Sequence, residues 1–393
     1  MSIHSEYSSF SGRGSLSAVV NELKRQKETK VDFVADTRQM TVGESEGRLK
    51  LYPSSDHDHI QIREFLDSSG IDITEQTLVQ IGQKSSPDIP SKFLKKLADQ
   101  KPALASSLLN GMFDDGSKRL VRCLDNKVRA FLSDRYRVLD NYDLAFQALE
   151  AVQAAGGEVL EAQLTDRHMR LKFTTRSIWD VIDEKRSSAP SSSWYAGGMG
   201  NQSHLSRVAA RTEGDLPGGE GTVHPLVTIS NSETGHGGLS VRMGILRAIC
   251  FNLATVEHTV KQIHLGSRME AGVFEADTVE ADSKAIWLKC RDAISKSFHP
   301  ASFDRIVKMA QNANSHQIDM PTVAVDHIVE STTLSQDSRD SILEYFLSDY
   351  DKTAYGLAQA VSRASQDVDD ADQSTEMEDV AGNLIRFPSM ATV

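Results

Sequence analysis

The sequence predicts an α+β fold, with an antiparallel sheet built from hairpins, packed helices, a helical C-terminal segment and a disordered acidic tail. Paired apolar segments with alternating polarity occupy residues 118–174, and helical periodicity dominates from Ala281 onward. Residues 366–379 carry seven Asp and Glu and no Lys or Arg, too much charge to pack. The predicted units are an N-terminal arm at 1–29, an α+β core at 30–270, a helical segment at 271–364 and the tail at 365–393.

Short elements are predicted before residue 118. A helix over Leu16 to Lys27 precedes two extended segments, Val31 to Ala35 and Arg48 to Tyr52, which are separated by a turn-prone stretch around Gly43 and Gly47. Three helical patterns follow, and proline stands at the start of two of them, where a helix tolerates it. They run through Leu78 and Ile81, over Ser91 to Ala98 and over Ala103 to Met112.

The central part predicts two hairpins around one helix. The helix, Tyr142 to Ala155, places Tyr142, Phe146, Leu149 and Val152 on one apolar face and ends at two glycines. Each hairpin is expected to bury one face, and the outer face of the second carries His168, Arg170 and Lys172. The hairpin strands are Arg119 to Cys123 with Val128 to Leu132, and Leu160 to Leu164 with Met169 to Phe173.

Residues 184–222 are dense in Ser, Gly and Pro and predict a long mobile loop. Trp194 and Tyr195 within it are unusual for a spacer. Strands are then predicted over Val223 to Ser230 and Gly238 to Met243.

Composition excludes several classes of protein. The 393 residues include no apolar run long enough to cross a membrane, no secretory signal is visible at the start, and three cysteines show no paired spacing. These features predict a protein of a reducing cytoplasm. The net charge of −12 is uneven, because residues 118–268 carry 19 Lys and Arg against 16 Asp and Glu. A basic middle inside an acidic chain leaves local polyanion binding open.

The basic hairpins are the leading candidate for a nucleic-acid site. Single-strand binders combine cations that follow the phosphates with rings on which bases stack. The alternative is that these cations only solvate a sheet while the rings fill the core. The predicted nucleic-acid-binding residues are Arg119, Arg122, Lys127, Arg129, Arg135, Tyr136, Arg137, Arg167, Arg170, Lys172, Trp194 and Tyr195.

Two segments carry a family resemblance. They are Phe131 to Asp140, and the signature from Ile229 to Gly235 that continues to Cys250 and Asn252. Both resemble the phage and plasmid family known as domain of unknown function 932, over roughly residues 30–364. The resemblance implies a setting of bacteriophages, prophages and conjugative plasmids, and hence the bacterial host cytoplasm, and it implies no mechanism. Together with the basic hairpins it predicts a single-stranded-DNA-binding accessory protein in replication, recombination or early transcription, acting as a homo-oligomer.

Other interpretations stay open. The acidic tail is similar to tails of single-stranded-DNA-binding proteins that recruit replication or transcription partners, and it would also suit an anti-defence protein that binds a host protein. An enzyme would use Glu233, His236 and Cys250 as base and nucleophile. The structural alternative for Ser230 to Gly238 is a turn whose glycines and polar side chains close a hairpin. No metal or cofactor is predicted, because Asp56 to His59 lacks partner ligands and no phosphate loop is present.

Overall fold

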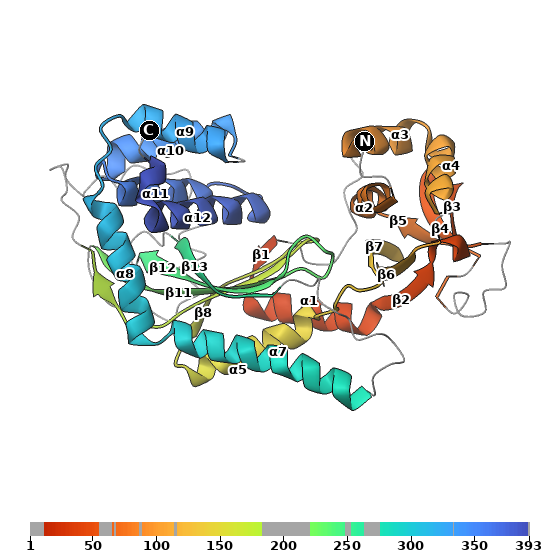
Figure 1. Ribbon diagram of the computed structural model, residues 1–393, viewed down its shortest axis with the longest axis horizontal. Coiled ribbons are helices and arrows are strands. Elements are labelled where there is room, and N and C mark those ends of the chain that lie inside the picture. Colours follow the sequence, from red (N-terminus) through yellow and green to blue (C-terminus); the bar gives the residue numbers. More distant parts are fainter. Residues whose placement is uncertain are drawn as a thin grey trace.

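The protein has two lobes, each built around one β-sheet (Figure 1). The computed structural model describes residues 12–54, 65–66, 68–85, 89–113, 116–182, 221–247, 253–262, 276–332 and 334–391. The predicted α+β class is confirmed. Of the described residues, those within 31–133 form the small lobe, and the N-terminal strand and helix together with those after residue 140 form the large lobe.

The small lobe holds a six-stranded mixed sheet, sheet B, in the order β2-β6-β7-β5-β4-β3. Its neighbours are antiparallel except β5 and β7, which run parallel. Helices α2, α3 and α4 pack on one face around Leu51, Ile81 and Phe131. The elements are β2 (Val31–Asp36), a 3-10 turn η1 (Thr37–Gln39), β3 (Met40–Ser45), β4 (Arg48–Pro53), β5 (Ile71–Ile73), α2 (Glu75–Ser85), α3 (Ser91–Gln100), α4 (Pro102–Phe113), β6 (Lys118–Leu124) and β7 (Lys127–Ser133).

The large lobe holds a seven-stranded sheet, sheet A, in the order β1-β8-β9-β11-β12-β13, with β10 paired to β11. All its pairs are antiparallel. The strands are β1 (Gly12–Gly14), β8 (Glu158–Leu164), β9 (Met169–Thr174), β10 (Asp180–Val181), β11 (Thr222–Asn231), β12 (Leu239–Arg247) and β13 (Leu253–Gln262).

Helices cover both faces of sheet A. On one face α1 (Leu16–Thr29), α5 (Asn141–Ala154) and α7 (Ala276–Ser297) form a core with Leu171, Val227 and Val241. The opposite face carries the C-terminal helices, which pack around Met243 and Ile245. These are α8 (Pro300–Ser315), α9 (Pro321–Ser331), α10 (Gln336–Asp349), α11 (Ala354–Ser365) and α12 (Ala371–Arg386), followed by a 3-10 turn η2 (Pro388–Ala391).

The two predicted hairpins exist, but they belong to different sheets. The β6–β7 hairpin lies in sheet B and the β8–β9 hairpin in sheet A, so they do not form one continuous surface. The segment predicted as an N-terminal arm also joins the large lobe, because β1 pairs with β8 and α1 enters the core. The predicted apolar face of α5 is correct at Val152, which is buried, and Tyr142 and Leu149 pack against the same core. It is wrong at Phe146, which is 45% exposed, and the buried face also includes Leu144, Ala145, Ala148 and Ala151.

The predicted disordered acidic tail is wrong, because residues 371–386 form α12. Asp370 caps this helix by accepting hydrogen bonds from the backbone amides of Asp372 and Gln373 at 2.8 and 3.0 Å. Met377, Ala381, Leu384 and Ile385 form an apolar stripe that is fully buried. The carboxylates that predicted disorder instead meet cations of sheet A. The charge of this segment alone therefore gave a wrong prediction of disorder, because the cations that pair with its carboxylates lie about two hundred residues earlier in the chain.

Some predictions lie outside the described residues. The predicted loop at 184–222 falls almost entirely there, together with Trp194 and Tyr195. Among the helices that the structure describes, none combines the length and the apolar character that a membrane span requires.

Candidate functional site

The signature segment forms the loop between β11 and β12, and it lies where the two lobes meet. Asn231 and Ser232 are fully buried, and Glu233 is 7% exposed. Gly235 has a φ of +82°, and a Cβ there would stand 2.6 Å from Leu132 Cδ2 of β7. The glycine therefore lets the loop turn directly against the small lobe, so we call residues 231–236 the junction loop.

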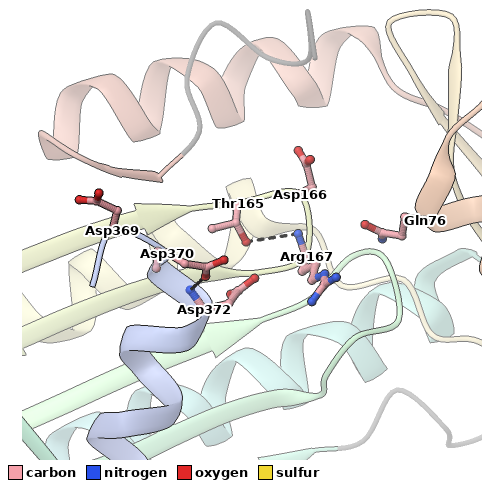
Figure 2. A pocket seen from close by; sticks show the side chains of 8 residues that line it. Gln76, Thr165, Asp166, Arg167, Asp369, Asp370 and Asp372 are labelled. Carbon is pink, nitrogen blue, oxygen red and sulfur yellow. Dashed lines mark hydrogen bonds between the residues drawn. The ribbon is translucent and has the colours of Figure 1, made fainter. Parts of the chain in front are cut away.

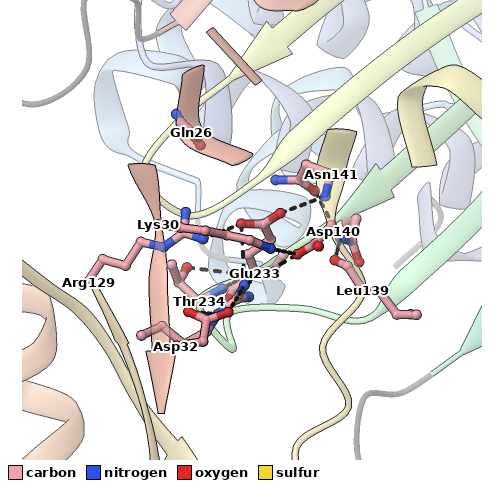
Figure 3. Close-up of polar contacts among 12 residues, drawn as sticks. Gln26, Lys30, Asp32, Arg129, Leu139, Asp140, Asn141, Glu233 and Thr234 are labelled. Atoms are coloured by element: carbon pink, nitrogen blue, oxygen red, sulfur yellow. Dashed lines mark hydrogen bonds and ion pairs between the residues drawn. The ribbon is translucent and has the colours of Figure 1, made fainter. Parts of the chain in front are cut away.

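Glu233 is the centre of the polar contacts in this loop (Figure 3). Its Oε1 accepts a 2.6 Å hydrogen bond from the backbone amide of Asn141, at the start of α5. Its Oε2 pairs with the Arg129 guanidinium, and Arg122 Nη2 lies 3.9 Å from the same oxygen. Burial would raise the pKa of Glu233, but the charges of Arg129 and Arg122 outweigh it and lower the pKa to about 2.

A β-bulge places both arginines on the same carboxylate. Arg122 lies opposite Ala130 in the β6–β7 ladder, and Cys123 lies opposite Val128, so Arg129 is an extra residue on its strand. Bulges redirect the side chain of the inserted residue. Arg129 therefore reaches Glu233 from β7 while Arg122 reaches it from β6.

Arg122 also joins the rest of the network to the loop. Its side chain is completely buried, and Nη1 donates 2.8 Å to the Glu233 carbonyl oxygen. Nε and Nη2 donate to Asp32 of β2 at 3.0 and 2.8 Å. Asp140, before α5, pairs with Lys30 and lies 3.5 Å from Arg122. These alternating charges (the junction network: Lys30, Asp32, Arg122, Arg129, Asp140 and Glu233) neutralise one another inside the protein.

Hydrogen bonds from uncharged side chains of other elements also hold the junction loop. Gln80 of α2 donates 2.6 Å to the Thr234 carbonyl oxygen and accepts from the Phe131 amide at 2.9 Å. The Tyr136 hydroxyl donates 2.7 Å to the Ser232 carbonyl oxygen. Asn231 Nδ2 donates to the Leu139 carbonyl oxygen at 2.9 Å. The loop is thus held by the small lobe and by the segment that connects the lobes.

Solvent-accessible cations surround the junction loop. Arg135 is exposed and is adjacent to Tyr136, while Arg137 is half-buried on the other side of that tyrosine. Arg167 is exposed in the β8–β9 turn, and its carbonyl oxygen accepts from the Thr234 hydroxyl at 3.4 Å. Arg135 and Arg167 make no ion pair with any carboxylate among the described residues. We call Arg135, Arg137 and Arg167 the junction rim.

Beside Arg167 a pocket of about 430 Å³ opens between the lobes (Figure 2). Gln76 of α2 forms its small-lobe side, the β8–β9 turn faces it, and the first turn of α12 closes the remaining side. Carboxylates dominate the lining, with Arg167 as the cation. The lining is Gln76, Thr165, Asp166, Arg167, Asp369, Asp370, Ala371 and Asp372.

The second group of predicted cations lies on the face of sheet A beneath α12. Arg170 Nη1 donates 2.5 Å to Asp372, which also contacts His168 Nδ1 at 3.1 Å. Lys172 is fully buried, and its Nζ lies 2.7 Å from Glu378 and 3.3 Å from Glu161. Burial would raise the pKa of Asp372, but His168 and Arg170 outweigh it, and the pKa falls well below its usual value. Arg242 of β12 pairs in the same way with Asp379.

The predicted nucleic-acid-binding residues therefore fall into separate groups. Arg122, Arg129 and Tyr136 are corrected to internal contacts of the junction, because carboxylates and carbonyl groups occupy their polar atoms. Arg170 and Lys172 are covered by α12, whose Asp372 and Glu378 pair with them. Arg135, Arg137 and Arg167 form the junction rim. Arg119 and Lys127 are half-buried on sheet B, and Trp194 and Tyr195 lie outside the described residues.

Sequence reasoning missed the carboxylates of these groups. Asp32 belongs to no motif, and Asp140 ends the segment Phe131 to Asp140 without a predicted role; both meet Arg122 only in the folded protein. Asp372, Glu378 and Asp379 lie in the run that is predicted to be disordered. One signal was available for α12, since Met377, Ala381, Leu384 and Ile385 recur at helical spacing within that region.

The site offers little acid–base or metal chemistry. A general base needs a pKa near the working pH, and the pKa of Glu233 lies far below it. Cys250 falls outside the described residues, and burial raises the pKa of Cys123 to about 12 and that of Cys290 to about 11. Within the described ranges, no three His, Cys, Asp or Glu side chains are placed to hold a metal ion.

Comparisons of the chain with protein-family models, with curated proteins and with solved structures each gave no match. The family resemblance of Phe131 to Asp140 and of Ile229 to Gly235 therefore stays a prediction.

Proposed function

We propose that this protein binds single-stranded DNA without catalysis, as an accessory protein of a phage or mobile element in replication, recombination or early transcription. The observation that carries the proposal is the junction rim. Arg135 lies in the segment that connects the lobes, and Arg167 lies in the large lobe. Both are exposed, Arg135 is next to Tyr136, which is hydrogen-bonded to the junction loop, and the Arg167 carbonyl oxygen contacts the same loop. Their guanidinium groups have no carboxylate partner among the described residues, so phosphates would meet them without first displacing an ion pair.

The rigid surroundings support the same proposal. The Tyr136 hydroxyl and the Arg167 carbonyl oxygen are hydrogen-bonded to residues of the junction loop. The segments that carry the rim arginines are thus attached to the junction loop before a ligand arrives. A segment that is already held loses less conformational entropy when its side chains bind a phosphate. In this proposal the protein acts in the host cytoplasm as a homo-oligomer, so that adjacent subunits would extend the contact along the strand.

Binding of a fluorescein-labelled oligothymidine, followed by anisotropy over a series of salt concentrations, tests the proposal. The wild type should bind with a strong salt dependence. Replacing Arg135 and Arg167 by Ala should weaken binding and reduce the slope of log affinity against log salt by about 1.4, or about 0.7 for each lost contact. The matched control is Arg291→Ala with Lys308→Ala, which removes two exposed cations from α7 and α8.

Equal losses in the rim and control variants, or a wild type that shows no salt-dependent binding, would overturn the proposal. A steep loss confined to the rim variant would support it.

A protein-binding role is the second candidate, and exposed apolar side chains at α9 and α10 favour it. Met320, the N-cap of α9, is 59% exposed, Val323 of α9 is 40% exposed, and Leu347 of α10 is 52% exposed. The segment before α9 and the end of α10 are linked through Lys352, whose carbonyl oxygen accepts from the Ile318 amide and whose Nζ donates to the Leu347 carbonyl oxygen. Exposed apolar patches mark interaction surfaces. A stoichiometric host partner, retained after nuclease treatment and lost in Met320→Ser with Leu347→Ser, would favour this role if DNA binding is absent.

A further inference from the structure

The face of sheet A beneath α12 is polar, although a sheet face covered by a helix is normally apolar. Antiparallel register places Thr228 opposite both Lys172 and Arg242, and Ser230 opposite both Arg170 and Ser240. Opposed residues project from the same face. Two neighbouring rows of polar side chains therefore cross β9, β11 and β12, with Arg170, Lys172 and Arg242 as the cations. We call these three residues the cationic face.

Helix α12 presents one carboxylate to each cation of this face. Asp372 pairs with Arg170 at 2.5 Å, Glu378 with Lys172 at 2.7 Å, and Asp379 Oδ2 accepts from Arg242 Nη1 at 2.5 Å. The carboxylates follow one another along the helix as phosphates follow one another along a strand. Both kinds of anion are acceptors of charge-assisted hydrogen bonds from Lys and Arg.

Several buried polar atoms of this interface have no partner. Thr228 Oγ1, Gln163 Oε1 and Arg242 Nε are buried without a hydrogen bond. Thr228 is 1% exposed, and Gln163 is fully buried. Unsatisfied buried polar groups oppose stable packing, and buried ion pairs seldom stabilise more than apolar contacts of the same size. The contact between α12 and the cationic face is therefore poorly suited to a purely structural role.

The acidic half of α12 is also anchored more weakly than its end. Met377 is the one large apolar side chain that is fully buried between Ala371 and Ala381, whereas Leu384 and Ile385 are fully buried beyond Gly382. Glycine lowers helix stability at an interior position. Gly382 therefore separates an acidic half from an apolar anchor, and displacing the acidic half would expose less large apolar surface than displacing the anchor.

We propose that the cationic face is a second polyanion-binding surface, and that the acidic half of α12 occupies it as an internal competitor for nucleic acid. The inference rests on the proposed function in taking single-stranded DNA as the polyanion. DNA held at the junction rim is close to this face, because Arg167 and Arg170 flank the start of β9. Phosphates would then replace Asp372, Glu378 and Asp379 one for one.

The test neutralises the competitor without changing its shape, in the variant Asp372→Asn, Glu378→Gln, Asp379→Asn. Its affinity for labelled oligothymidine should rise about tenfold or more, and its salt slope should steepen by about 2, or about 0.7 for each of three new contacts. The control Asp292→Asn, Glu330→Gln, Asp340→Asn removes the same charge from exposed positions. An equal rise in both variants, or no rise in the α12 variant, would overturn the inference.

Hydrogen exchange of the wild type supplies a second measurement that does not depend on the folding of a variant. Backbone amides of residues 373–381 should exchange faster when oligothymidine is added, while those of Leu384 and Ile385 should not change. Unchanged or slower exchange over 373–381 would contradict displacement.

The two proposals fail in different ways. Wild-type binding that depends on Arg135 and Arg167 but is not improved in the α12 variant rejects only this inference. Binding by the α12 variant alone, with no binding by wild type, rejects only the junction rim.

Discussion

Arg122 of β6 donates a 2.8 Å hydrogen bond to the carbonyl oxygen of Glu233, 111 residues later in the chain, and with Arg129 it neutralises the Glu233 carboxylate. This contact joins the two lobes. Asp32 of the small lobe accepts from Nε and Nη2 of Arg122, whereas Nη1 donates to the junction loop of the large lobe, so the buried guanidinium uses acceptors from both lobes. The position of the lobes and the position of the rim arginines therefore depend on the same contact.

Glu233→Gln should destabilise the protein by about 3–5 kcal/mol, because it leaves two buried guanidinium groups without their shared carboxylate. Chemical denaturation followed by tryptophan fluorescence measures the effect. Asp292→Asn, which removes the exposed partner of Arg291 on α7, is the matched control and should change the free energy of unfolding by less than about 0.5 kcal/mol. Similar small effects in both variants would show that Glu233 does not hold the junction.

Acid should weaken the folded state through the same residue. The pKa of Glu233 is about 2 in the folded protein against an ordinary value of 4.5, so the unfolded chain binds the proton more tightly. The stabilisation is present above pH 4.5, and it is lost as the pH falls toward 2, by about 3 kcal/mol in total. Denaturation curves from neutral pH down to about pH 3 should show this loss in wild type and a smaller one in Glu233→Gln. An equal loss of stability with falling pH in wild type and in Glu233→Gln would contradict this prediction.

Gly235→Ala should cost more stability than Gly47→Ala. Both glycines have positive φ, +82° and +75°, so both variants incur the backbone strain of about 1–2 kcal/mol. Only at position 235 does the new methyl group meet another side chain, Leu132, which is itself buried. The difference in melting temperature between the two variants isolates this contact, and we expect it to correspond to about 1 kcal/mol or more. Equal melting temperatures of the two variants would mean that the junction loop moves away from β7 at no cost in stability.

Lys172→Met alone should be strongly destabilising, by about 3–5 kcal/mol, because it leaves Glu161 and Glu378 buried and unpaired. Adding Glu161→Gln and Glu378→Leu should restore stability, since the charges are then gone and Gln163 keeps an acceptor at position 161. Calorimetry of the single and triple variants makes the comparison. A triple variant as unstable as the single one would show that Lys172 contributes by packing instead of charge.

Leu384→Ala should destabilise the large lobe by about 2–5 kcal/mol, because this side chain of α12 is fully buried in its core. Leu347→Ala on α10 is the control, since that side chain is 52% exposed. Thermal unfolding of both variants decides whether the C-terminal helix belongs to the folded core. No effect at position 384 would restore the interpretation of residues 365–393 as a loose tail.

Local patterns were sufficient for most elements. The β6–β7 and β8–β9 hairpins, the helices α1 to α5 and the helical C-terminal segment follow from alternation, helical spacing, glycine and proline. Local patterns failed at β3. Gly43 and the polar residues beside it predict only a turn, although this segment is a strand that pairs with β4. Edge strands receive part of their stability from pairing, and pairing is not visible in a short window.

The sequence by itself determined the α+β class, the two hairpins and the identity of the basic residues that could contact a phosphate. Only the tertiary structure decided which of them are accessible. Arg122 and Lys172 stand on strands with the same alternation as any surface cation, yet both are fully buried against carboxylates from distant segments. The physical reason is that the energy of a buried charge depends on partners brought together by folding, whereas periodicity records only the side of its own strand from which a residue projects.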